Sequence, residues 1–147
     1  MKYRPLMIFR SSQPDQADVC YNTSVITVSD DQFDELTNQA LASLPGEHAK
    51  QIANVAILRE DDPTPEQRTQ LQLRNDQTLF GLYEGLPLSQ RQGQTRLMPD
   101  KITLFKHPLC YASRDIPNLL ENIRHTLWHE IGHYYGLNHQ RIRELEQ

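Results

Sequence analysis

The most regular pattern of apolar positions in the chain lies near its C-terminal end. From residue 116 onward, apolar side chains recur every three or four residues, which is the period of one face of an α-helix. The recurring residues are Ile116, Leu119, Leu120, Ile123, Leu127, Ile131 and Tyr134. Asp115, directly before this run, is a favourable N-cap, and Pro117 suits a first helical turn. The pattern therefore predicts a long helix that packs one side against a core.

Shorter patterns predict strands and further helices upstream and downstream of this helix. Apolar and β-branched runs predict strands at 25–28, 54–59, 79–83 and 102–105, of which 54–59 reads as a buried strand. Ser29 or Asp30 can cap a helix that ends near Pro45-Gly46. The remaining expected elements are a short helix at 65–73, a polar loop at 86–99 and a last helical turn at 141–146. Helices and strands do not alternate regularly, so the expected fold class is α+β.

Length and charge restrict the possible classes of protein. A chain of 147 residues suits a single domain, 1–147, in which residues 1–24 lack a regular pattern. The chain has no apolar run long enough to cross a membrane, and we expect no membrane partner. The net charge of −4 and the lack of a basic stripe make nucleic acid an improbable partner. Cys20 and Cys110 are far apart, which suits a reducing cytoplasm better than a disulfide framework.

One segment near the C-terminus, His-Glu-Ile-Gly-His-Tyr-Tyr-Gly-Leu-Asn-His, matches the pattern HExxHxxGxxH. His129 and His133 are four residues apart and therefore share one face of the predicted helix. Two imidazoles so spaced can bind one zinc ion, with Glu130 beside the metal as a candidate general base. Gly136 lets the chain leave the helix, so that His139 can return as a third ligand. Three nitrogen ligands and an open fourth position are typical of a catalytic zinc site.

This pattern is far more specific than its first five positions alone. HExxH should arise by chance in roughly one or two chains per hundred with this His and Glu content. Requiring the next Gly and His lowers that to roughly a few chains per hundred thousand. Leu127 and Ile131 define a stripe that faces the core, and His129 points away from it. The alternative interpretation is a solvated helix face that carries histidines and binds no metal.

Several further blocks accompany this motif in a fixed order. They are Leu44-Pro45, Val55–Arg59, Gly81–Pro87, Met98–Phe105 and Thr126–Gly136. In their order and spacing, from about residue 30 to the C-terminus, the chain resembles the minimal zincin-like metallopeptidases. These are small bacterial proteins once grouped as a domain of unknown function. The resemblance implies an α+β domain in which a small mixed sheet packs beside the HExxH helix, with a zinc site on that helix.

The third ligand position departs from this family pattern. In the minimal zincins the position of His139 is often acidic, whereas a histidine there resembles the metzincins. Metzincins also have a methionine turn after the third histidine, and this chain has no methionine after Met98. The resemblance is therefore to the minimal zincins, with His139 as an unusual ligand.

Three functions compete on this evidence. The first is a zinc peptidase in which Glu130 activates water and a peptide or protein substrate lies along a sheet edge, at 79–83 or 102–105. The second is a catalytically silent zinc-binding interaction module, which would not require Glu130. The third is a zinc-dependent endoribonuclease of the rRNA-maturation type, which spaces three histidines as at 129, 133 and 139. That family has no Glu directly after its first histidine, and an acidic chain suits RNA poorly.

Overall fold

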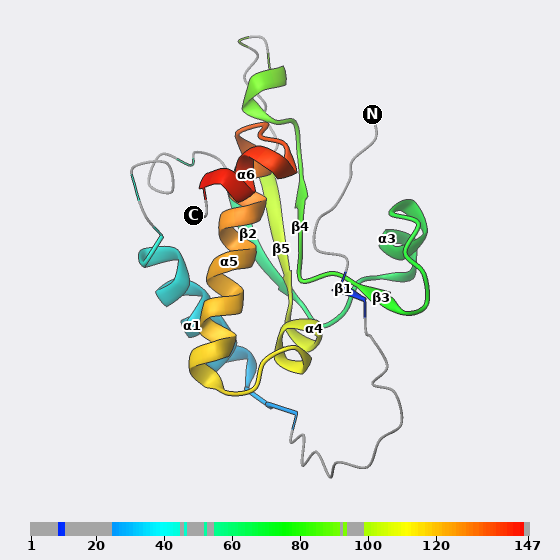
Figure 1. Cartoon of the computed structure of the whole chain (residues 1–147), viewed down its shortest axis with the longest axis vertical. Coiled ribbons are helices and arrows are strands. Elements are labelled where there is room, and N and C mark those ends of the chain that lie inside the picture. The colour runs from blue at the N-terminus through cyan, green and yellow to red at the C-terminus, as the bar shows by residue number, and fades with distance from the viewer. Residues whose placement is uncertain are drawn as a thin grey trace.

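A three-stranded mixed sheet forms the centre of the molecule, with the strand order β2–β5–β4 (Figure 1). β2 (Val55–Glu60) runs parallel to β5 (Asp100–Phe105), with Val55 opposite Asp100. β4 (Gly81–Glu84) runs antiparallel to β5 on its other side, with Gly81 opposite Leu104. The predicted α+β class with a small mixed sheet is therefore confirmed.

The structure is a computed structural model that describes residues 9–10, 25–44, 46, 52, 55–91, 93 and 99–145. Within these ranges, the side chains of residues 9, 10, 88, 139 and 143 lie outside the description. Of the expected irregular segment 1–24, only Phe9–Arg10 is described, and it forms strand β1. Cys20 and part of the expected loop at 86–99 lie outside the described residues.

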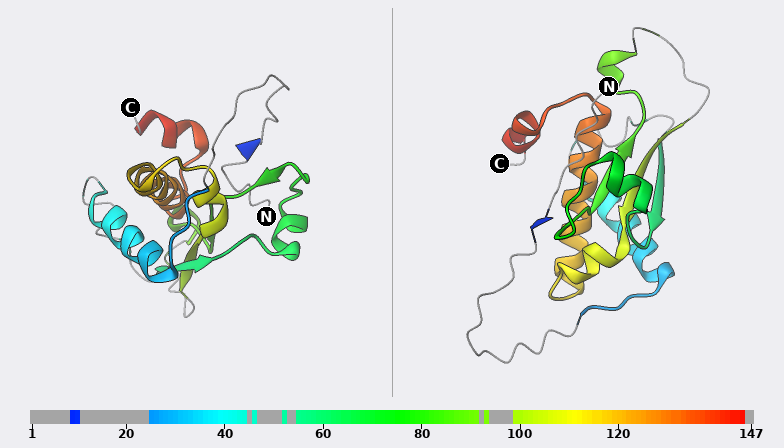
Figure 2. Two further views of the ribbon diagram at one scale, coloured as in Figure 1. Left: turned by 90° about the horizontal axis from the view of Figure 1, so that it is seen from below. Right: turned by 90° about the vertical axis from the view of Figure 1, so that its right-hand side faces the viewer.

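Two helices, α1 (Asp30–Ala42) and α5 (Ile116–Tyr134), pack against one face of this sheet (Figures 1 and 2). The core between them is built from side chains that are almost completely buried. It includes Phe33, Leu36 and Ala40 of α1, Ile102 and Leu104 of β5, and Leu119, Ile123, Leu127 and Ile131 of α5. Each large side chain buried here contributes about 1.5–3 kcal/mol relative to an exposed position. The apolar stripe read from the sequence is the core face of α5.

A smaller apolar cluster covers the opposite face of the sheet. Leu79, Leu82 and Phe105 are buried there, with Leu71 and Leu73 packed against them. The surrounding elements are α3 (Pro65–Gln70) and β3 (Gln77–Thr78), which pairs antiparallel with β1. The 3-10 turn η1 (Leu88–Gln90), α4 (Lys106–Tyr111) and α6 (His139–Leu145) complete the described elements.

The start of α1 is fixed by a cap and by ion pairs to other elements. Ser29 accepts a hydrogen bond from the Gln32 backbone N–H at 3.1 Å, and the Gln32 side chain accepts from the Ser29 N–H at 2.9 Å. Asp30 contacts Lys106 at 2.8 Å and Arg59 at 3.1 Å, and the hydrogen bond from Lys106 is the main cause that lowers the pKa of Asp30. These contacts tie α1 to β2 and to the start of α4.

Three sequence expectations about elements need correction. Residues 25–28 do not form a strand, because no described strand lies beside them; Val28 instead packs in the core directly before the cap of α1. The strand expected at 54–59 is β2, which is only half-buried, with Leu58 44% exposed. Of the strand expected at 79–83, only residues 81–83 belong to a strand, because β4 begins at Gly81 and pairs with β5 from there to Glu84.

None of the described helices is both long enough and apolar enough to cross a membrane.

Candidate metal site

The C-terminal half of α5 carries His129, Glu130 and His133. The helix begins as the sequence predicted, because the Asp115 side chain accepts a hydrogen bond from the Asn118 backbone N–H at 2.8 Å. Such a cap stabilises a helix by roughly 1 kcal/mol. Because the core stripe fixes the rotation of the helix, it also determines where the two histidines and the glutamate point.

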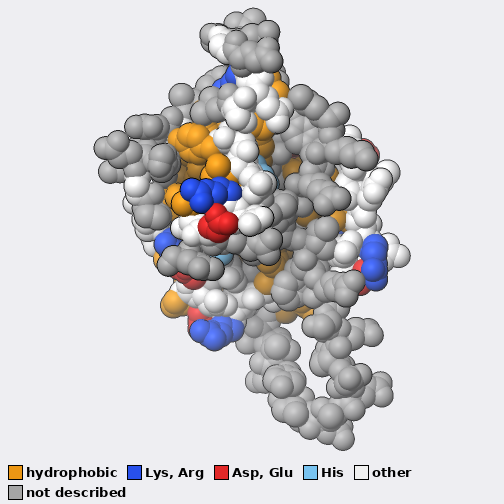
Figure 3. Space-filling model, turned by 45° about the horizontal axis from the view of Figure 1, so that its top comes forward, with side chains coloured by type: hydrophobic (Ala, Val, Ile, Leu, Met, Phe, Trp, Pro, Cys, Tyr) orange, Lys and Arg blue, Asp and Glu red, His pale blue; other side chains and the backbone are white. Residues whose placement is uncertain are grey.

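The two histidines lie side by side and are largely shielded from water. Their ring centroids are 5.0 Å apart and the rings are inclined by 75°. His129 is 5% exposed, and the Nε2 atoms of both rings are buried. Figure 3, which brings the top of Figure 1 forward, shows only small areas of histidine surface on this face of the molecule. A solvated histidine face, the alternative weighed from the sequence, is therefore excluded for His129.

Glu130 is buried between α5 and the sheet, with 1% of its surface exposed. Its Oε2 accepts a hydrogen bond from the backbone N–H of Tyr83 in β4 at 2.9 Å. Its Oε1 is buried and has no hydrogen-bond partner among the described residues. Burial raises the pKa of Glu130 from 4.5 to about 8, against the smaller effect of the Tyr83 N–H, which lowers it. A cation close to this carboxyl group would favour its ionised form.

The end of α5 redirects the chain toward the third predicted ligand. Gly136 has φ +80°, a left-handed conformation that glycine adopts without strain. The Gly136 N–H donates to the His133 carbonyl at 2.9 Å and the Leu137 N–H to the Gly132 carbonyl at 3.0 Å, which is a Schellman end. The chain then begins α6 at His139.

The position of α6 depends on Gly132, one residue before His133. A Cβ atom at Gly132 would lie 2.7 Å from Cδ1 of Ile142, which is 1% exposed. The missing side chain therefore makes the space in which Ile142 packs α6 against α5. The backbone of His139 is brought back beside the end of α5, but its side chain lies outside the description. Among the described side chains, no three His, Cys, Asp or Glu residues are grouped to hold a metal.

Residues 79–83 are one of the two candidate substrate strands predicted from the sequence, but no local pattern indicated that β4 would bond Glu130. The Phe105 N–H donates to the Phe80 carbonyl at 2.9 Å, so Phe80 and Phe105 form a hydrogen-bonded pair. In an antiparallel ladder such pairs alternate, so Gly81 and Tyr83 direct their backbone groups away from β5. This is why the Tyr83 N–H can reach Glu130. Gly81 allows the approach, because its Cβ would lie 2.6 Å from Thr126 Cγ2 and 3.2 Å from Glu130 Cγ.

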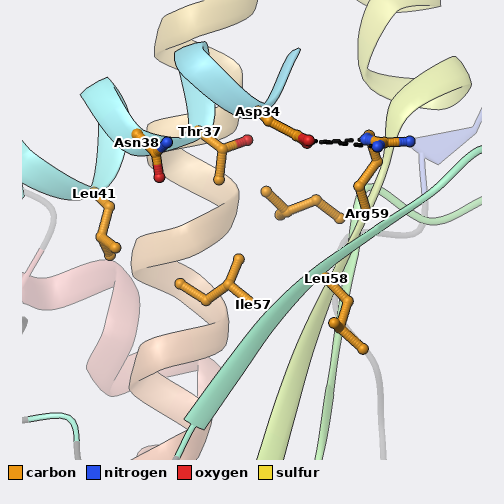
Figure 4. A pocket seen from close by; sticks show the side chains of 8 residues that line it. Asp34, Thr37, Asn38, Leu41, Ile57, Leu58 and Arg59 are labelled. Atoms are coloured by element: carbon orange, nitrogen blue, oxygen red, sulfur yellow. Dashed lines mark hydrogen bonds and ion pairs between the residues drawn. The ribbon is translucent and has the colours of Figure 1, made fainter. Parts of the chain in front are cut away.

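A pocket of about 280 Å³ lies away from this site, between α1 and β2 (Figure 4). Leu41, Ile57 and Leu104 contribute apolar surface to it, and the Asp34–Arg59 ion pair borders it. Because β2 is at the opposite edge of the sheet from β4, this pocket is separate from the surroundings of Glu130.

Comparison with known proteins places the chain in a family. A sequence model of the zincin-like metallopeptidase family matches residues 52–147, which include β2, β4, β5, α5 and α6. No protein of curated function matches the chain. Among solved structures, a conserved hypothetical protein from T. thermophilus is similar, with 17% sequence identity and a TM-score of 0.47. That similarity covers 74% of this chain and 94% of the other. The match over residues 52–147 establishes that the chain belongs to the zincin-like metallopeptidase family, whose fold implies zinc binding.

Proposed function

We infer that this protein is a zinc-dependent peptidase in which His129, His133 and His139 hold the metal and Glu130 is the general base. The observation that carries this inference is the environment of Glu130. A buried carboxylate next to two histidines has one oxygen fixed by the Tyr83 N–H and the other without a described partner. Burying a carboxyl group in this way costs free energy, and a structural role would not require it.

The described residues fit a zinc ion in their chemistry. Neutral imidazole nitrogens are preferred zinc ligands, and the two rings are adjacent with buried Nε2 atoms. A bound zinc ion would supply Lewis-acid chemistry, polarising a carbonyl group and making water acidic near neutral pH. His139, which begins α6, is the proposed third ligand. This ligand set leaves a position open for substrate and water.

Glu130 is suited to move one proton between water and the leaving group. Its Oε1 would accept a proton from the water that attacks the peptide carbonyl carbon. As the C–N bond breaks, the same carboxyl group would donate that proton to the amide nitrogen. The products are a carboxylic acid and an amine. The Tyr83 N–H keeps Oε2 occupied throughout, so the carboxyl group stays in one orientation.

The proposed substrate is a peptide or an extended protein segment that adds to strand β4. Of the two candidate strands, β5 is the central one and already has a neighbour on each side. Among the described residues, β4 pairs only with β5 along its length, and the backbone groups of Gly81 and the carbonyl group of Tyr83 point toward the other side. The Tyr83 N–H points the same way but remains bonded to Glu130. A peptide strand there would run directly past Glu130.

The decisive experiment compares wild type, Glu130→Gln and Glu121→Gln in digestion of a peptide library, with chelator controls. Glu121 is an exposed residue of the same helix, paired with Arg124 at 2.7 Å, and serves as the matched control. We expect Glu130→Gln to bind zinc as wild type does but to lose roughly 10²-fold or more of its hydrolysis rate. Glu121→Gln should retain the rate.

The two alternative functions predict different results. A silent zinc-binding module would bind zinc stoichiometrically and cleave no peptide, in either the wild type or the variants. A zinc-dependent endoribonuclease would bind RNA with an affinity that falls steeply with salt. Either result, obtained with zinc-loaded wild type, would replace the peptidase assignment.

A further inference from the structure

Arg91 makes an unusual set of contacts for a residue in a polar connecting segment. Its Nε donates to the Leu86 carbonyl at 2.7 Å, and its guanidinium group forms an ion pair with Asp100. Its Cζ lies 5.4 Å from the centroid of the Tyr134 ring, within the range of a cation–π contact. The two charged side chains are 15% and 1% exposed. One arginine therefore joins the segment after β4, the start of β5 and the end of α5.

The same carboxylate also holds Tyr83. The Tyr83 hydroxyl donates to Oδ2 of Asp100 at 2.6 Å, which is the oxygen that Arg91 contacts. The Tyr83 ring meets the Tyr134 ring edge to face, with centroids 6.3 Å apart. At the other end of this residue, its backbone N–H donates to Glu130. Asp100, which accepts the hydrogen bond from the Tyr83 hydroxyl, is therefore itself held in place by its ion pair with Arg91.

We propose that Arg91 is a positioning residue for Glu130 and acts through Asp100 and Tyr83; this rests on the proposed role of Glu130 as general base. A buried ion pair is often no more stabilising than well-packed apolar residues of similar volume, so stability alone accounts poorly for this pair. The contacts instead lead in an unbroken series from Arg91 to Asp100, to the Tyr83 hydroxyl, and from the Tyr83 N–H to Glu130. A second contact, on the Tyr134 ring, fixes Arg91 beside the residue that follows His133.

The test is amide hydrogen exchange at Tyr83, which requires neither activity nor metal. This N–H donates to a side chain and not to the sheet ladder, so its protection reports on the bond to Glu130. Arg91→Met should accelerate exchange at Tyr83 by roughly tenfold or more relative to amides in the middle of α5, such as that of Ile123. Tyr83→Phe should accelerate it similarly, and the double variant should add little further. Arg91→Lys retains a buried cation and should give a smaller increase in the rate of exchange at Tyr83. This variant replaces Arg91→Met in the test if Arg91→Met does not fold.

Arg59→Met is the matched control. Arg59 also bonds a carboxylate, that of Asp34 at 2.9 Å, but at the opposite edge of the sheet. Arg59→Met should leave the ratio of Tyr83 to Ile123 exchange unchanged. The proposal is overturned if the Arg91 variants leave Tyr83 exchange unchanged, or if they accelerate all amides by one common factor, as a merely structural role would.

The rate of peptide hydrolysis gives a second test of Arg91 that does not depend on amide exchange. In a zinc-loaded, peptide-cleaving protein, Arg91→Lys should lower kcat while zinc affinity stays within about threefold of wild type, since Arg91 is not a ligand. If the wild type binds zinc and cleaves no peptide, the proposed function fails, and exchange at Tyr83 still decides whether Arg91 positions the Glu130 carboxyl group.

Discussion

The two carboxylate oxygens of Glu130 have different surroundings, and this asymmetry is the central observation at the residue scale. Oε2 accepts from the Tyr83 N–H, whereas Oε1 is buried without a described partner. This arrangement suits the proposed general base, because the bond to Oε2 holds the carboxyl group while Oε1 can exchange a proton. The arrangement depends on how closely β4 approaches α5, and that distance is set by Gly81.

Replacing Gly81 by alanine should therefore disturb both packing and the site. The new Cβ would lie 2.6 Å from Thr126 Cγ2, so β4 and α5 would have to separate. We expect a loss of about 1–3 kcal/mol in the free energy of unfolding, measured by urea denaturation, because the site is overpacked. Exchange of the Tyr83 N–H should accelerate in the same variant.

A second substitution distinguishes overpacking from a general effect of alanine in the strand. Thr126→Ser removes the methyl group that the new Cβ would meet but keeps the hydroxyl that donates to the Asn122 carbonyl at 2.8 Å. Gly81→Ala combined with Thr126→Ser should recover most of the lost stability. If the double variant is no more stable than Gly81→Ala alone, close contact with Thr126 is not the reason for glycine here.

At the scale of elements, the turn after α5 matters most for the candidate site, because it determines where α6 and His139 lie. The Schellman end at Gly136 and the packing of Ile142 over Gly132 determine where α6 begins. His139 is the first residue of α6, so its proposed role as a ligand depends on these two contacts.

His139→Ala should weaken zinc binding more than the loss of an outer-shell partner does, which is roughly 10–100-fold. His125→Ala is the control, because His125 is an exposed residue one turn before His129 on the same helix. Affinity is measured by competition with a chromophoric chelator. Equal affinities of the His139 variant and the wild type would show that the third ligand is another group.

Local patterns predicted α5 and its cap correctly because both depend on neighbouring residues only. The apolar period of α5 and Asp115 were sufficient to predict where the helix begins and which side carries His129. The Tyr83–Glu130 bond could not be predicted in this way, because it joins residues 47 positions apart through an edge strand. Arg91 lies in a stretch that reads as a polar loop. The strand expected at 25–28 failed for the related reason that β-propensity has effect only beside a pairing partner.

At the scale of the whole molecule, the candidate site lies where three parts of the fold meet. α5 supplies two histidines and the glutamate, β4 fixes the glutamate, and α6 follows the turn that leads to the third histidine. The segment around η1 completes this region, because a Cβ at Gly136 would lie 2.9 Å from Cβ of Ser89. Metal binding should therefore stabilise several elements together.

Zinc should raise the unfolding temperature of the whole domain, and the increase should depend on pH. A ligand present at about 100 times its Kd stabilises the folded state by about 2.7 kcal/mol, which corresponds to an increase of roughly 5–10 °C for a domain of this size. Protons compete with zinc for the imidazole nitrogens, whose ordinary pKa is about 6.5. The stabilisation is therefore complete well above this pKa and is lost as the pH falls below it. Calorimetric scans with and without zinc, at about pH 7.5 and about pH 5, test this.

The control is a double variant, His129→Ala with His133→Ala, whose unfolding temperature zinc should not raise at either pH. An equal increase in the unfolding temperature of the wild type at both pH values would contradict binding through histidines.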